Sequence, residues 1–118
     1  MKKYLGLVLG SLLLAGCGMA DFNGSRTGNE SQFLMEYTIF NTTDSQLLEL
    51  KKGEQIHGEI EKISGKLAVS IQQEGKAPIL ESKDMPSGSF DLEIEEDGKY
   101  RITVTGERAK GSVSFTKE

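Results

Sequence analysis

Carboxylate side chains are the largest set of groups in this chain that could do chemistry. Glu59 and Glu61 share one face of a predicted strand, and Asp91, Glu93 and Glu95 share one face of another. Ca²⁺ takes six to eight oxygen ligands, and paired carboxylates also serve glycoside hydrolysis. If the two strands are neighbours, Glu59, Glu61 and Glu93 are weak candidates for a metal site. The alternative, which we favour, is a solvated face neutralised by lysine and arginine, with no metal.

His57 is the only histidine of the 118 residues. It stands between Ile56 and Gly58, which point inward in the predicted strand, so we expect its ring to face solvent. No second histidine and no spare cysteine can complete a metal or nucleophile site with it. The serines have no other base, and the chain contains neither a nucleophile-elbow motif nor a glycine-rich phosphate-binding motif. We therefore expect neither an enzyme nor a cofactor.

The only cysteine, Cys17, ends a segment with the features of an export signal. Two lysines follow Met1, the apolar run 5–14 is too short to span a bilayer, and small residues precede the cysteine. Residues 14–17, Leu-Ala-Gly-Cys, resemble the bacterial lipobox, which implies that residues 1–16 are cleaved and that Cys17 is acylated. Two alternatives are an ordinary secretory signal with an incidental cysteine and an uncleaved N-terminal anchor.

Membrane attachment through a lipid on Cys17 implies an extracytoplasmic protein, held at the cell membrane or at an outer membrane if the organism has one. The chain has 18 acidic and 14 basic residues, which argues against a nucleic-acid partner.

Residues 17–31 mix Gly, Ser, Asn and Thr without an apolar period, so we predict a flexible tether there.

From residue 32 to residue 118 the apolar residues recur with a period of two, which indicates β-strands. Seven or eight strands in so small a domain cannot bury their apolar faces in one open layer. We therefore predict an all-β domain over 32–118, a two-sheet antiparallel β-sandwich of jelly-roll-like architecture.

One register can be predicted in detail from the alternation over residues 90–104. A three-residue loop ending at Gly98 would pair Ile94 with Tyr100 and bring their apolar faces together. Gly98 would then occupy the left-handed position that such a loop requires. We therefore predict that the strands on either side of this loop form a hairpin.

Three apolar residues are candidates for a binding surface. The first predicted strand has an inward set formed by Phe33, Met35, Tyr37 and Ile39. Leu34 and Phe40 alternate with this set, and Met85 lies in a loop beside Pro86. The alternatives, which we favour, are that this strand is covered on both faces or that a β-bulge returns Phe40 to the core.

The segment 50–115 resembles the small sandwich of Golgi-dynamics (GOLD) domains and bacterial pre-peptidase C-terminal domains. The resemblance rests on residues 50–54, 65–71 and above all 90–106. The chain also resembles the many small bacterial lipoproteins that contain such a sandwich. It implies architecture and a generic role in binding proteins or glycans, although the cysteines of the GOLD disulfide are missing. We expect non-catalytic binding of another protein or an envelope polymer. The alternatives are a regulator or inhibitor of an envelope enzyme and a carbohydrate or small-ligand module.

Overall fold

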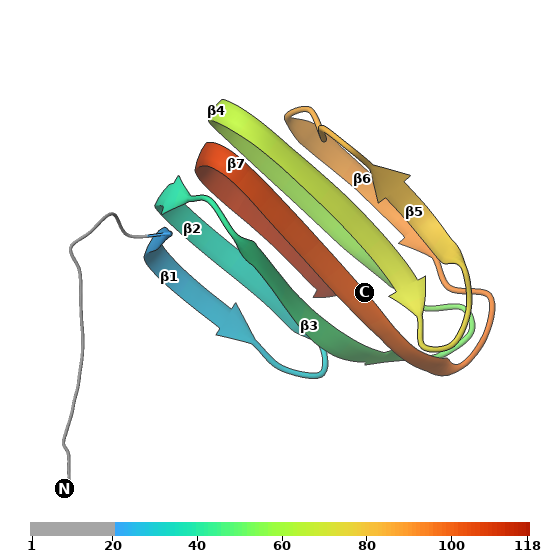
Figure 1. Cartoon of the computed structure of the whole chain (residues 1–118). Helices are drawn as coiled ribbons and strands as arrows, with labels where there is room; N and C mark the ends of the chain where they lie inside the picture. Colours follow the sequence, from blue (N-terminus) through green and yellow to red (C-terminus); the bar gives the residue numbers. More distant parts are fainter. Residues whose placement is uncertain (1–20) are drawn as a thin grey trace, which may run out of the picture.

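The computed structural model describes residues 21–118, which form antiparallel strands joined by turns and contain no helix (Figure 1). No helix able to cross a membrane is found in this part of the chain. The strands are β1 (Phe22–Gly28), β2 (Gln32–Phe40), β3 (Thr43–Leu50), β4 (Gln55–Gln73), β5 (Pro78–Ser82), β6 (Gly88–Glu93) and β7 (Gly98–Lys117). The all-β class and the strand number agree with the sequence prediction.

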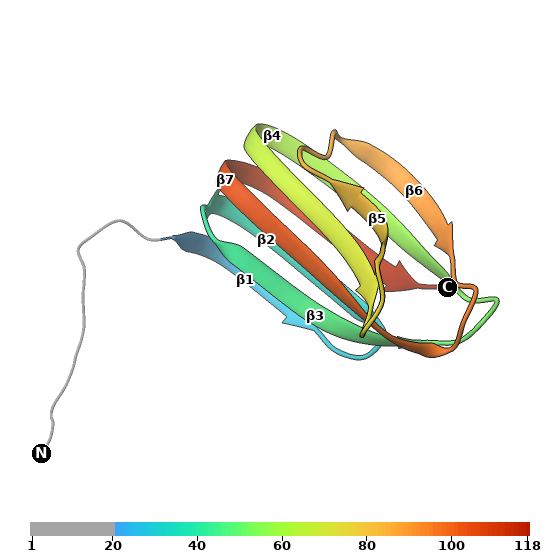
Figure 2. The same ribbon diagram turned by 45° about the vertical axis from the view of Figure 1, so that its right-hand side comes forward.

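Two long strands, β4 and β7, pair with each other along almost their whole length. Their neighbours change halfway, since β6 and β2 flank one half of this pair while β5 and β3 flank the other. The single hydrogen-bonded sheet therefore folds over into two layers (Figure 2). We call the layer with β3 and β5 layer A, and the layer with β1, β2 and β6 layer B.

The fold in the sheet lies where the β4–β7 register is irregular. Register shifts fall on both sides of Ser64, where Gly65 has φ of +81°. On the opposing strand Arg108 has φ of +52°, and its backbone N–H donates to Asn41 Oδ1 at 3.0 Å. Bulges bend strands and increase their twist, so this segment turns both strands from one layer into the other.

The core lies between the two layers and is formed by the alternate inward residues of the strands. The predicted inward set of the first strand is confirmed for Phe33, Met35 and Tyr37, whereas Ile39 is 40% exposed. Burial of one large apolar side chain contributes about 1.5–3 kcal/mol. The other fully buried large side chains are Phe40, Leu48, Leu50, Ile56, Leu67, Val69, Ile71, Ile94, Ile102, Val104 and Phe115.

Arg26 of β1 joins the two layers at one open edge. Its guanidinium Nε lies 2.7 Å from Asp44 Oδ2 on β3, and its Nη2 donates to the Ser45 carbonyl oxygen at 2.8 Å. The same guanidinium stands 4.9 Å from the centre of the Phe33 ring. Charge-assisted and cation–π contacts thus cover the edge of the core between β1 and β3.

The prediction of a flexible tether over 17–31 is wrong for residues 22–28, which form β1. This strand pairs with β2 in antiparallel register, with Phe22 opposite Phe40 and Gly28 opposite Phe33. Its composition resembles that of a linker because β1 is an edge strand with mostly exposed side chains. Two contacts, the Arg26 link and the packing of Phe22 on the core, hold it in place.

The predicted hairpin around Gly98 is also wrong. Tyr100 pairs with Leu48 on β3 and with Gln73 on β4, while β6 pairs with the other half of β4. Ile94 bonds instead to the turn after β3, where its N–H donates to the Glu54 carbonyl oxygen at 2.9 Å. The loop before Gly98 therefore passes from layer B to layer A, and Gly98 has no positive φ.

Replacing Gly65 with alanine should destabilise the protein more than the same change at Gly53. Both glycines have positive φ. A Cβ added at Gly65 would collide with the Arg108 carbonyl, whereas a Cβ added at Gly53 would have no atom within 4 Å of it. We expect a loss of about 3 kcal/mol for Gly65→Ala and about 1 kcal/mol for Gly53→Ala. Equal losses in denaturant unfolding would contradict this account of the bend.

Candidate functional site

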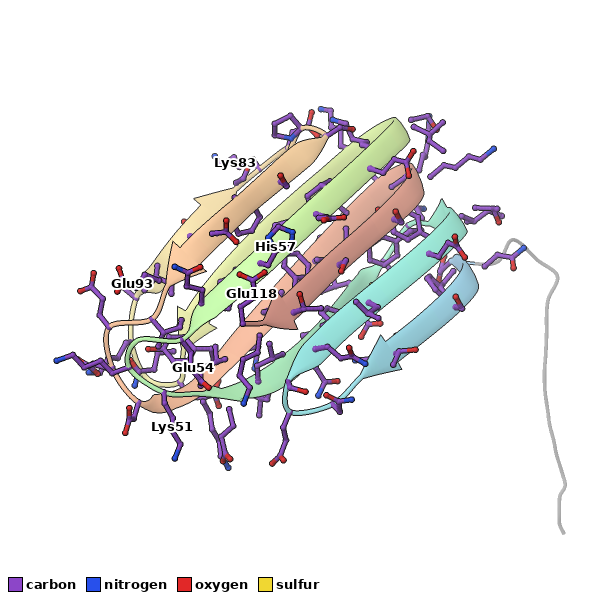
Figure 3. All side chains as sticks on the ribbon, turned by 180° about the vertical axis from the view of Figure 1, so that it is seen from behind. Lys51, Glu54, His57, Lys83, Glu93 and Glu118 are labelled. Carbon is purple, nitrogen blue, oxygen red and sulfur yellow. The ribbon has the colours of Figure 1, made fainter. Side chains whose placement is uncertain are left out.

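The outer face of layer B carries a cluster of ionisable side chains around His57, which we call the His57 cluster (His57, Glu59, Asp91 and Glu118). In the β4–β6 ladder His57 stands directly opposite Asp91, and their Nδ1 and Oδ1 atoms are 2.8 Å apart. On the other side of the ring, Nε2 lies 2.9 Å from Glu59 Oε2. Glu118 follows β7 directly, and its Oε2 lies 3.9 Å from Nδ1 of His57. Figure 3 shows the side chains of His57 and Glu118 close together.

Because each ring nitrogen faces a carboxylate, the cluster favours the doubly protonated imidazolium of His57. The hydrogen bond to Glu59, followed by that to Asp91, raises the pKa of His57 from 6.5 to about 9. The ring is 26% exposed, as the alternation of β4 predicts for an outward residue. At neutral pH His57 is thus a cation that donates to two carboxylates, and it has no lone pair with which to act as a base.

The three carboxylates predicted as weak metal candidates do not converge, although β4 and β6 are indeed neighbours. Glu59 contacts His57, Glu61 lies opposite Ser112 on β7, and Glu93 lies opposite Gln55 at the far end of β6. Residues 21–118 contain one group of at least three side chains whose possible metal-ligand atoms all lie within 4.8 Å of one another. This group consists of His57, Asp91 and Glu118. The β4–β6 register, which creates this group, is not visible in the sequence.

Phe40 is not part of an exposed patch, so that prediction is wrong. The β2–β7 register shifts between Tyr37 and Phe40, and the Phe40 side chain is fully buried. Its ring contacts those of Phe22 and Tyr37, at centroid distances of 5.9 and 5.1 Å. A bulge that returns Phe40 to the core, the alternative considered from the sequence, is what the structure contains.

The other two candidates for a binding surface, Leu34 and Met85, are half-buried. Leu34 lies on the outer face of layer B, as its position in β2 predicts. Met85 packs against the core, and its N–H donates to the Leu67 carbonyl oxygen at 2.6 Å. The preceding Asp84 accepts from Lys62 Nζ at 2.7 Å, which lowers the pKa of its carboxyl group. This loop is thus fixed against β4.

A groove of about 400 Å³ opens on the outer face of layer B near the bend. Ile63 on its wall is 63% exposed. Charged and small polar residues surround Ile63, among them Glu36, Thr38, Glu61 and Lys110. Ile63 is not among the binding residues predicted from the sequence, although an apolar residue at an outward position of β4 was the signal available there.

No known protein family and no curated protein matches the sequence. Several solved structures resemble the fold, among them two from bacteria. One is PliG from Aeromonas hydrophila, a periplasmic inhibitor of g-type lysozyme, with 17% identity, a TM-score of 0.49, and 84% of this chain and 88% of that chain covered. The other is the pre-peptidase C-terminal domain of a Bacillus anthracis collagenase, with 12% identity, a TM-score of 0.50, and coverage of 78% and 91%.

At these identities the similarity concerns the fold alone. The pre-peptidase C-terminal domain is the kind of sandwich that the sequence resemblance implied, so that expectation is confirmed at the level of architecture.

The single imidazole permits a direct test of the His57 cluster by NMR titration in metal-free buffer. We expect a midpoint near pH 9, and a lower midpoint after Asp91→Asn, with Glu61→Gln as the control that leaves it unchanged. Because the folded-state pKa lies above the ordinary value of 6.5, the stabilisation by this cation is complete below about pH 6.5. It is lost as the pH rises through about 9. A midpoint near 6.5 would show that the carboxylates do not hold the ring.

Proposed function

We propose that this chain is a lipid-anchored, extracytoplasmic β-sandwich that binds another protein or an envelope polymer without catalysis. The anchor rests on the lipobox-like residues ending at Cys17, which lie outside the described part of the chain. The observation that carries the binding role is the groove near the bend, with Ile63 exposed on its wall.

Ile63 has the surroundings of an interface centre. An exposed isoleucine that is covered by a partner contributes about 1.5–3 kcal/mol. Specific interfaces place apolar side chains at the centre and polar ones at the rim, and here the rim includes Glu36, Glu61 and Lys110. Both charge signs are present, so the rim can pair with polar groups of a protein partner.

The positions of the aromatic residues favour a protein over a sugar as the partner. Sugar-binding surfaces commonly use exposed aromatic rings, whereas Tyr37 and Tyr100 are each 3% exposed. Phe22 and Phe90 pack against the core. In the described residues the aromatic side chains therefore stabilise the sandwich rather than form a stacking platform.

The state of His57 supports the non-catalytic part of the proposal. A serine nucleophile requires a neutral imidazole close by, but the pKa of His57 is raised to about 9 by two carboxylates. Its Nε2 faces Glu59 rather than a hydroxyl group. The only histidine of the chain is therefore part of a surface charge cluster and has no serine hydroxyl as its partner.

The anchor can be tested by labelling with radioactive palmitate in a bacterial host. We expect the wild-type protein to incorporate label and to sediment with membranes, and Cys17→Ser to lose both properties while the sandwich still folds. Absence of label from the wild-type protein, or membrane attachment unchanged in Cys17→Ser, would contradict the anchor.

The binding surface can be tested with a photo-cross-linking amino acid at position 63. Position 79 on β5 is a matched control, because Ile79 is an exposed isoleucine too, at 45%, but lies in layer A. Irradiation of intact cells should yield a discrete adduct from position 63 and not from position 79. Failure to obtain an adduct at position 63, or the same adduct from both positions, would contradict the assignment.

A further inference from the structure

We propose that His57, Asp91 and Glu118 form a surface site for a divalent transition-metal ion of the Zn²⁺ type. The site lies on the outer face of layer B, away from the Ile63 groove, and it does not depend on the proposed binding function. It also differs from the calcium site considered from the sequence, because a nitrogen ligand is central to it.

The three ligand atoms lie within 4.8 Å of one another, and the two distances to the imidazole nitrogen are close to those that one ion requires. Zn²⁺ binds nitrogen and oxygen at about 2.0–2.2 Å, so two ligands of a tetrahedral ion lie about 3.3 Å apart. Asp91 Oδ1 is 2.8 Å from His57 Nδ1, and Glu118 Oε2 is 3.9 Å from it. Both carboxylates are about half exposed, so small rotations of their side chains can bring them to the ion.

Glu59 is placed to accept the hydrogen bond that a metal-binding histidine normally donates from its second ring nitrogen. A ligating imidazole usually donates its other N–H to a carboxylate, which fixes the tautomer and the orientation of the ring. His57 Nε2 is 2.9 Å from Glu59 Oε2, which leaves Nδ1 directed to Asp91 and Glu118. The ion would take the place of the proton that Nδ1 carries in the metal-free protein, so binding would release that proton. Glu59 is thus a positioning residue rather than a ligand.

The backbone holds the ligands on paired strands. Asp91 and His57 are register partners in the β4–β6 ladder. Glu118 is fixed beside the start of β4, because its N–H donates to the Gln55 carbonyl oxygen at 2.8 Å and its own carbonyl accepts from Gln55 N–H at 3.1 Å. A site built on rigid elements has less conformational entropy to lose when the ion binds.

The donor set selects the class of ion. One imidazole nitrogen with two carboxylate oxygens suits Zn²⁺ and its neighbours in the transition series, whereas Ca²⁺ prefers six to eight oxygens. The third carboxylate, Glu59, adds negative charge beside the ion. The three protein ligands leave a fourth position of the tetrahedron for water.

The test is calorimetric titration of Zn²⁺ into the purified protein without a polyhistidine tag. We expect one site per chain. His57→Ala and Asp91→Asn should each weaken binding more than 10-fold, and Glu59→Gln about 10-fold. Glu61→Gln is the matched control, since it removes a carboxylate from the same face outside the cluster, and its affinity should stay within about twofold of the wild-type value.

A second measurement needs no variant, and so does not depend on the stability of the mutants. Substoichiometric Co²⁺ should broaden the imidazole signals of His57 before any other side-chain signal. The proposal is wrong if millimolar Zn²⁺ gives no heat, if His57→Ala binds Zn²⁺ as tightly as the wild-type protein, or if Co²⁺ leaves the imidazole signals sharp.

Discussion

The backbone hydrogen bonds between β4 and β7 extend from the pair Ile56–Lys117 to the pair Gln73–Tyr100, and both layers of the sandwich contain these two strands. Every other strand except β1 is paired directly with one of them. The irregular register around Ser64 is what allows one ladder to serve two layers. Core, edges and outer faces all depend on that bend, because it determines which side of each half-strand faces inward.

Local periodicity in the sequence was sufficient to predict strands and their inward residues. Alternation decides the face of a residue without reference to its partner strand, so Phe33, Met35 and Tyr37 could be assigned to the core. The same information cannot specify which strands pair. Ile94 and Tyr100 alternate as a hairpin would, yet each finds its partner far away in the sequence, since the loop between them changes layers.

The same limit applies to the candidate site, where the face of each residue was predictable from the sequence but the pairing of the strands was not. The sequence indicated that His57, Glu59 and Asp91 face outward, and these residues do so. Their assembly required the β4–β6 register and the end of β7, neither of which leaves a local signal. For Phe40 the alternation predicted the wrong face. The register shift between Tyr37 and Phe40 turns its side chain inward, whereas alternation alone would leave it outside.

The position of β1 has a consequence for the geometry of the protein at a bilayer. Residues 22–28 belong to the folded body, so an acyl group on Cys17 would be joined to it by the few residues before Phe22. Five extended residues span about 17 Å at most. The sandwich would then lie close to the lipid headgroups with little freedom to move away from them. Its partners would have to be molecules that also reside near that surface.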